Sequence, residues 1–213
     1  MENQQVICLL GEAELRILSA FFPEGAERTT KEIEGRSGYS HERVHSMLNT
    51  LEGKEILSRR SVGKALVYSI RRYGDPAYLA FTYYSINRKG AFIKKHPQAW
   101  RAVEEFMGKA EPELAVLFGS YSKGGANAGS DIDMLCICGN RKAEKIALSL
   151  RHKYNLKISP VIVSKEEFRN IRADNPELWG EIVRFGVVLK GQELFYDLVY
   201  PFTLQYLRQP AGD

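Results

Sequence analysis

Two aspartates, Asp131 and Asp133, are separated by a single isoleucine and follow a stretch rich in glycine and serine. On a β-strand, side chains two positions apart point to the same face, so these two carboxylates can share one hard cation such as Mg²⁺. Gly119 and Ser120 end the apolar segment before this stretch, where backbone N–H groups and a hydroxyl can hold phosphate oxygens. Lys123 adds a positive charge beside them. The residue types therefore predict a site for a phosphate chain and a divalent metal.

The spacing of these residues matches a known signature. Gly119-Ser120, ten intervening residues and Asp131-Ile132-Asp133 resemble the GS…DxD motif of the polymerase-β-like nucleotidyltransferase superfamily, in its minimal prokaryotic and archaeal form. The later segment NPELWGEIVRFGVVLKGQELF is similar to the C-terminal helix and closing strand of small prokaryotic members. The resemblance implies that Asp131 and Asp133 are the catalytic residues and bind Mg²⁺ or Mn²⁺, and that the nucleoside triphosphate (NTP) is bound by Gly119, Ser120, Lys123 and Ser130.

One part of the family pattern is missing. Family enzymes carry a third carboxylate on the next core strand, where it completes the metal site and helps activate the acceptor hydroxyl. Here that strand, LKISPVIVS, contains no acid, and Ser159 or Pro160 stands at the expected position. Pro160 also lacks a backbone N–H, which predicts an edge position or an irregularity.

Two interpretations of this departure remain open. The protein either transfers a nucleotidyl group from an NTP to a hydroxyl on a protein, nucleic acid or small molecule, using an unidentified base, or it is a catalytically degenerate, nucleotide-sensing transcriptional regulator. Because the binding residues are present and the third carboxylate is not, retained binding is favoured over retained transfer.

The elements around the motif predict a small mixed sheet flanked by helices. Apolar strands are expected at LAVLFGS, DIDMLCIC and KISPVIVS, with helices at RKAEKIALSLRHKYN, KEEFRNIRA and PELWGEIVRFG. The alternation in DIDMLCIC places Cys136 and Cys138 on the face of Ile132 and Met134, opposite the aspartates. Both cysteines are expected to be buried thiols, as is Cys8.

The first third of the chain has a different pattern. Helical spacing is found in GEAELRILSAFF, in RTTKEIEGRSG, which Thr29 or Thr30 can cap, and in YSHERVHSMLNTLEGKEIL, where Ser40 is a natural N-cap. LSRRSVGKALVYSI reads as two strands around residues 62–64. Three helices followed by a hairpin resemble a winged helix-turn-helix domain. We therefore expect a two-domain α+β protein, with a winged helix at 1–72, a helical connector at 73–110 that breaks near Gly90 and Pro97, and a nucleotidyltransferase-like domain at 111–213.

The third predicted helix has competing interpretations. HERVH formally matches HExxH, in which two histidines bind zinc, but no third ligand follows, and packing already explains the helix. A DNA recognition helix is favoured, and a protein interaction or dimerisation module is the alternative. For DNA, Ser40, His41 and Arg43 would face the major groove, and Arg59, Arg60 and Lys64 would bind phosphates.

Composition sets wide limits. The 213 residues carry 30 Lys plus Arg against 26 Asp plus Glu, a charge of +4 that permits nucleotide or nucleic-acid partners without requiring them. Three cysteines without a CxxC indicate neither a disulfide framework nor a zinc ribbon. No apolar run reaches the roughly 20 residues of a membrane span, so a cytoplasmic protein with no membrane partner is expected. A homodimer is compatible with a winged helix that reads two half-sites.

Overall fold

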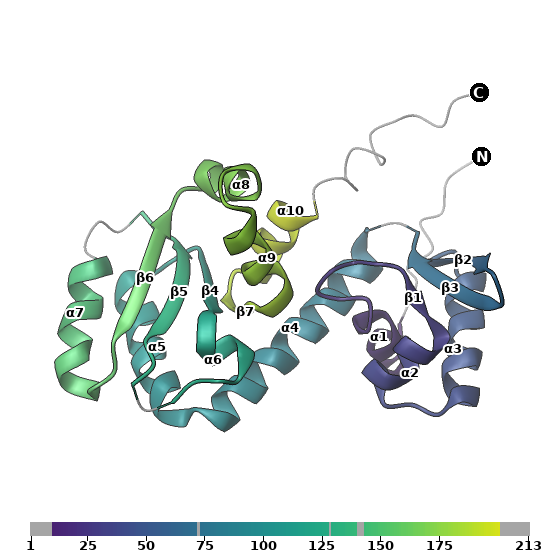
Figure 1. The fold of residues 1–213 in the computed structure, drawn as a ribbon, viewed down its shortest axis with the longest axis horizontal. Helices are drawn as coiled ribbons and strands as arrows, with labels where there is room; N and C mark the ends of the chain where they lie inside the picture. The colour runs from purple at the N-terminus through teal and green to yellow at the C-terminus, as the bar shows by residue number, and fades with distance from the viewer. Residues whose placement is uncertain (1–9, 72, 128, 140–142, 201–213) are drawn as a thin grey trace. The chain divides into compact units, whose positions relative to one another are not determined.

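The computed structural model describes residues 10–71, 73–127, 129–139 and 143–200 (Figure 1). Cys8 and the end of the expected second domain, 201–213, lie outside the described residues. The chain divides into two compact units between Tyr84 and Ser85, inside the helix α4 (Asp75–Lys95). In the ranges that the structure describes, no helix is both long enough and apolar enough to cross a membrane.

In its described residues, the first unit contains helices α1 to α3, a small antiparallel sheet and the first part of α4. Its elements are α1 (Glu12–Ser19), β1 (Arg28–Thr29), α2 (Thr30–Ser37), α3 (His41–Gly53), β2 (Leu57–Val62) and β3 (Ala65–Ile70), and the sheet order is β1-β3-β2. The predicted helices and hairpin are confirmed. Val44, Leu48 and Leu51 of α3 are fully buried, as their helical spacing requires.

Local signals account for where these helices begin and end. Thr29 caps α2, since its hydroxyl accepts from the Glu32 N–H while the Glu32 carboxylate accepts from the Thr29 N–H. Gly38 ends α2 with φ of 70°, a conformation that glycine adopts readily. Ser40 is the N-cap residue of α3 as predicted, but its side chain makes no capping hydrogen bond.

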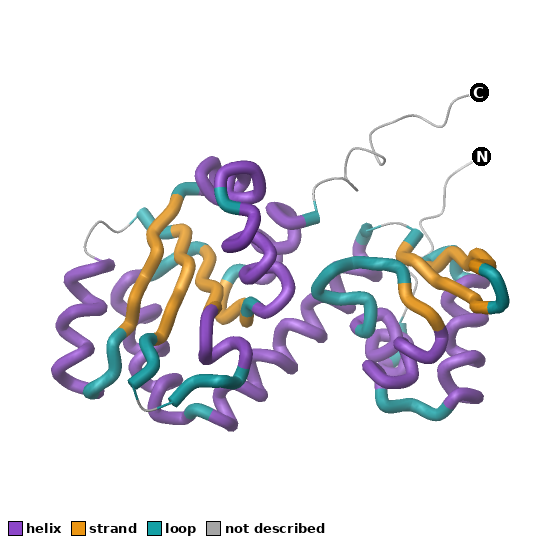
Figure 2. Tube along the Cα trace, viewed as in Figure 1, coloured by secondary structure: helices purple, strands orange, loops and turns teal. Residues whose placement is uncertain are grey.

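The second unit is built on a four-stranded mixed sheet. After α5 (Pro97–Ala110) come β4 (Leu114–Phe118), α6 (Gly119–Lys123), β5 (Ile132–Ile137), α7 (Ala143–Tyr154), β6 (Ile158–Val163), α8 (Lys165–Asp174), α9 (Pro176–Phe185), β7 (Val187–Lys190) and α10 (Gln192–Val199). The order is β6-β5-β4-β7, with β5 and β6 parallel and the other pairs antiparallel. Helices α5 and α7 cover one face, and α8, α9 and α10 contact the sheet from the other side (Figure 2). The predicted α+β class with helices around a mixed sheet is confirmed.

The strand that follows the glycine-rich loop is buried at every position except Asp133. Ile132, Met134 and Cys136 are fully buried in the core with α5 and α7, as predicted, and Leu135 and Ile137 of the other face are buried as well. Cys136 is the buried thiol that was expected, whereas Cys138 is only partly buried against the same core. One correction concerns Asp131, which was expected on this strand but lies immediately before it. The parallel ladder with β6 starts only at Ile132, so the backbone at Asp131 is not paired.

The predicted chain breakers had different outcomes. Pro97 begins α5, and Pro160 lies on the edge strand β6, as predicted. The predicted break at Gly90 is wrong, because α4 continues through it to Lys95. A single glycine costs a helix only about 1 kcal/mol, and α4 is fastened on both sides of Gly90. There Lys89 donates to the Leu189 carbonyl at 2.9 Å and Lys95 to the Gly124 carbonyl at 3.0 Å.

Candidate functional site

The antiparallel pairing of β4 with β5 brings the two halves of the motif together. Phe118 is the register partner of Asp133, so Gly119 follows β4 directly beside that carboxylate. Gly119 has φ of 70°, and a Cβ atom built on it would overlap with the Asp133 carboxylate. Both the backbone conformation and the close approach therefore require glycine at this position.

Helix α6 carries two of the other predicted phosphate-binding residues, Ser120 and Lys123. Ser120 lies in its first turn, and the Ser122 hydroxyl donates to the Gly119 carbonyl at 2.9 Å, which stabilises the turn. At the end of α6, the Lys123 ammonium pairs with Glu181 of α9 at 2.6 Å. Ser130 is engaged in the loop, where its hydroxyl accepts from the Asn127 N–H at 2.9 Å.

Asp131 is bound from β6 and the residue before it. Lys157, which precedes β6, forms an ion pair with Asp131 Oδ2, and the Ser159 hydroxyl lies 3.4 Å from the same oxygen. Ser159 is also the register partner of Asp133. Of the two positions named for the missing carboxylate, the structure therefore places Ser159 opposite Asp133.

The electrostatics of this cluster favour a cation. The pKa of Asp133 is raised, first by its burial and then by the negative charges of Asp131 and Glu181, while Lys157 opposes the rise. Oxygen donors under excess negative charge are the ligands that Mg²⁺ and Mn²⁺ prefer. Asp131 and Asp133, with the Ser159 hydroxyl, fit such an ion. In the described ranges, no group of three or more His, Cys, Asp or Glu side chains is placed to hold a metal ion, and this includes the candidate site.

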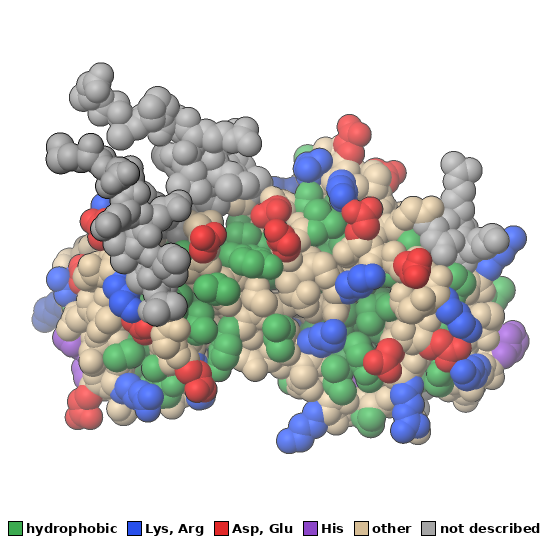
Figure 3. Space-filling model, turned by 180° about the vertical axis from the view of Figure 1, so that it is seen from behind, with side chains coloured by type: hydrophobic (Ala, Val, Ile, Leu, Met, Phe, Trp, Pro, Cys, Tyr) green, Lys and Arg blue, Asp and Glu red, His purple; other side chains and the backbone are tan. Residues whose placement is uncertain are grey.

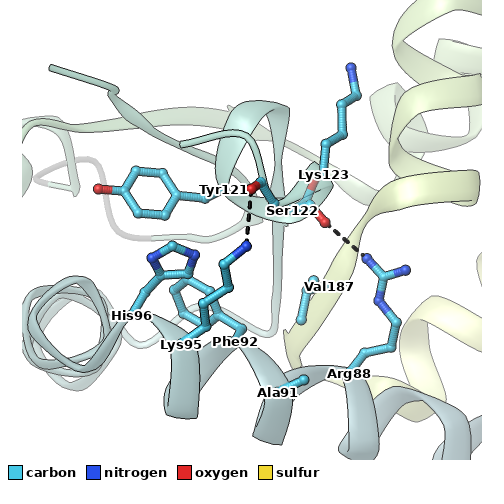
Figure 4. Close-up of a pocket in the computed structure, with 10 residues that line it drawn as sticks. Arg88, Ala91, Phe92, Lys95, His96, Tyr121, Ser122, Lys123 and Val187 are labelled. Carbon is cyan, nitrogen blue, oxygen red and sulfur yellow. Dashed lines mark hydrogen bonds between the residues drawn. The ribbon is translucent and has the colours of Figure 1, made fainter. Parts of the chain in front are cut away.

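A hollow lies on the side of α6 that faces the second unit's part of α4. Its volume is about 220 Å³, and Figure 4 shows Arg88 and Lys95 pointing from α4 toward α6. The Arg88 guanidinium donates to the carbonyls of Ser122 at 3.2 Å and Phe185 at 2.7 Å, and Lys95 donates to that of Gly124. Helix α4 thus fixes the C-terminal end of α6 through backbone carbonyls.

In the first unit, the predicted DNA-binding cations mostly have acidic partners. Arg60 forms a bidentate ion pair with Glu27. Arg59 Nε lies 3.4 Å from Glu52 Oε1, and His41 Nδ1 lies 2.6 Å from Glu34 Oε1. Lys64 stands in the turn between β2 and β3. Basic and acidic side chains are interspersed on the visible described residues of the face drawn in Figure 3.

The start of α3 carries the remaining predicted DNA contacts. Arg43 stacks on Tyr39 with 4.2 Å between the guanidinium carbon and the ring centre. In the HERVH segment, the His41 and His45 rings are 6.3 Å apart, and His45 Nδ1 lies 3.2 Å from the side-chain amide of Asn49.

Sequence reasoning did not assign Lys157 or Glu181 to the site. Lys157 had a weak signal, since it begins the strand on which an acid was sought. Glu181 had none, because only the packing of α9 brings it to Lys123 of α6. The basic residues Arg88 and Lys95 are predicted from the sequence either on a solvated helix face or on a track beside the nucleotide site, and in the structure both donate to backbone carbonyls at α6.

Part of the second unit is similar to known proteins. Residues 101–193 match the protein family described as Polymerase beta, Nucleotidyltransferase. This segment is a nucleotidyltransferase domain. The chain is 28% identical over 110 residues to a putative protein adenylyltransferase of Methanocaldococcus jannaschii, an alignment that covers 45% of this chain and 69% of that relative. A solved structure of a toxin-antitoxin with AMP-PNP is similar at 21% identity and a TM-score of 0.33, covering 51% of this chain and 88% of that one. The family predicted from GS…DxD is confirmed for the nucleotidyltransferase domain.

Proposed function

We propose that the nucleotidyltransferase domain, taken as residues 111–213, binds an NTP together with Mg²⁺ or Mn²⁺. The observation that carries this proposal is the approach of Gly119 to Asp133, because it joins the phosphate-binding half of the motif to the metal-binding half. Asp131 and Asp133 would hold the metal. Gly119, Ser120, Lys123 and Ser130 would hold the phosphate chain.

The reaction that fits this site is nucleotidyl transfer. An acceptor hydroxyl oxygen forms a bond to the α-phosphorus and gives up its proton to water, the bond from that phosphorus to the bridging oxygen breaks, and pyrophosphate leaves. A bound divalent ion would supply positive charge for the phosphate oxygens. The chain itself would orient the phosphates with the Ser120 hydroxyl and the Lys123 ammonium. The name of the Methanocaldococcus jannaschii relative, a putative protein adenylyltransferase, favours ATP as the donor and a protein hydroxyl as the acceptor.

A second candidate function is nucleotide sensing without transfer, and one observation on β6 favours it. The strand expected to carry the third carboxylate presents Ser159 opposite Asp133 and begins next to the cation Lys157. A protein with this arrangement would bind nucleotide and metal without transferring, and it would act as a nucleotide-sensing regulator.

One experiment separates these two functions. The intact protein is incubated with each labelled NTP, Mg²⁺ or Mn²⁺, and host lysate, and is compared with the Asp131→Ala/Asp133→Ala variant. Label that enters protein or nucleic acid only with the wild type establishes an enzyme. NTP binding that is lost in the variant, with no label transferred by either protein, establishes the sensor. Absence of metal-dependent NTP binding by the wild type would refute both.

For the first unit we propose a winged helix-turn-helix domain, residues 1–72, joined through residues 73–110 to the nucleotidyltransferase domain. The order of α1, β1, α2, α3, β2 and β3 and the short turn at Gly38 between α2 and α3 support this proposal. DNA is the proposed partner, with α3 in the major groove and the β2–β3 hairpin on the phosphates. The acidic partners of Arg59 and Arg60 would be displaced by phosphates on binding.

A further inference from the structure

Lys157 is held beside the candidate metal site by the sheet itself. The Ile132 N–H donates to the Lys157 carbonyl at 2.8 Å, and the parallel ladder begins with the next residue pair, Ile132 and Ile158. From this fixed backbone the Lys157 ammonium reaches Asp131 Oδ2. The two side chains are 49% and 38% exposed, so ions from solvent can reach the pair.

The charges around the pair leave Lys157 with a distinct role. Lys123, the cation on α6, is paired with Glu181. Among the residues that the structure describes, Lys157 is thus the cation whose ion pair is with one of the two aspartates. Its charge lies two residues before Ser159, the position opposite Asp133 where the family pattern leads one to expect an acid, so this site has a different charge balance from a three-carboxylate site.

We propose that Lys157 is an internal counter-ion that competes with the divalent metal for Asp131 and is displaced when metal binds. The inference rests on the proposed function and adds the residue that sets the metal affinity. A divalent ion on Asp131 and Asp133 and an ammonium group on Asp131 Oδ2 repel each other at such short range. The ammonium is carried by a flexible four-carbon stem, so it can leave without moving β6.

The displaced ammonium group can bind the nucleotide at the same site. Because its backbone stays at the start of β6, the group remains near the aspartates and can bind an oxygen of the incoming triphosphate. Lys157 thus lowers the affinity of the site for the metal alone and favours binding of the metal together with the nucleotide.

The test measures Mn²⁺ binding to the intact protein by isothermal titration calorimetry, with no nucleotide present. The variant is Lys157→Met, which keeps most of the side-chain length and removes the charge. Lys165→Met is the matched control, since Lys165 is similarly exposed and paired with Glu113, and it follows the opposite end of β6. It removes the same net charge without touching Asp131. Both changes are also made in an Asp131→Asn background.

Lys157→Met is expected to bind Mn²⁺ roughly two- to fivefold more tightly than the wild type, which is the scale of an exposed ion pair. Lys165→Met should bind as the wild type does, and Lys157→Met should have no effect once Asp131 is Asn. Equal or weaker binding by Lys157→Met would overturn the inference and leave the proposed function intact. If Lys157→Met and Lys165→Met both bound Mn²⁺ more tightly by the same factor, the inference would also be overturned, because the higher affinity would then reflect the net charge alone. Absence of saturable Mn²⁺ binding by every protein would overturn the proposed function and this inference with it.

Discussion

Gly119→Ala tests whether the two halves of the nucleotidyltransferase motif depend on one glycine. The substitution places a non-glycine residue at φ of 70°, which costs about 1–2 kcal/mol. The added methyl group also overlaps with the Asp133 carboxylate. To restore ordinary van der Waals contact, that carboxylate must move on the order of 1 Å, whereas metal ligation tolerates only about 0.2 Å. We expect the Mn²⁺ affinity to fall by roughly 10- to 100-fold.

Gly124→Ala is the matched control. Gly124 follows the same helix, α6, and has φ of 79°, so the backbone strain is similar. Its added methyl would meet only the Lys95 Nζ at 3.1 Å, which is the end of a flexible side chain. Gly124→Ala should therefore lose about the same 1–2 kcal/mol of stability and keep its affinity for Mn²⁺.

Both quantities can be measured on the intact protein. The two tryptophans of the chain, Trp100 and Trp179, lie in the second unit, so urea unfolding followed by tryptophan fluorescence reports on that unit. Calorimetry with Mn²⁺ gives the affinity. The reasoning is refuted if Gly119→Ala binds Mn²⁺ as the wild type does, or if Gly124→Ala loses affinity to the same extent.

Three other predictions concern separate parts of the chain. Ser159→Asp puts a third carboxylate opposite Asp133, and it should tighten Mn²⁺ binding roughly tenfold, the attraction expected between a carboxylate and a divalent ion about 5 Å apart in water. Calorimetry against Ser159→Ala checks this, and equal affinities would contradict it. Glu27→Gln frees Arg60 from its ion pair and should strengthen binding to duplex DNA, whereas Arg60→Ala should weaken it and lower the salt slope by about one. Fluorescence anisotropy at several salt concentrations checks both, and unchanged binding in the two variants would refute DNA contact by the hairpin. Hydrogen bonds from Lys109, Lys153 and Tyr154 lower the pKa of Glu105 to about 2, so the stability that Glu105 adds over Gln is complete above about pH 4.5 and is lost as the pH falls toward 2. Urea unfolding of Glu105→Gln across this range measures it, and a constant difference from the wild type would contradict the pKa.

Short-range signals predicted much of the fold. The alternation of Ile132, Met134 and Cys136 depends only on the two-residue period of a strand, and it correctly grouped three residues that are buried in one core with α5 and α7. The edge position of Pro160 follows from its missing N–H in the same way. Such properties belong to a residue and its neighbours in the chain, so they can be read without knowing the tertiary structure.

Other features depend on contacts between distant segments. Gly90 was predicted to break a helix because its intrinsic cost was considered without the contacts that Lys89 and Lys95 make on either side of it. Lys157 and Asp131 are 26 residues apart, and the pair exists only because β6 lies parallel to β5 in one particular register. A shift of that register by one residue would turn the Ser159 side chain to the opposite face of the sheet.

The edge position of β6 has a consequence for how this family can change. A strand at the margin of a sheet has one neighbour instead of two, and β6 is half-exposed along much of its length. Substitutions at Ser159 and Lys157 can therefore add or remove charge beside the aspartates while the sheet core stays intact. In this fold, a change of charge at the candidate site can therefore be separated from the ability to fold.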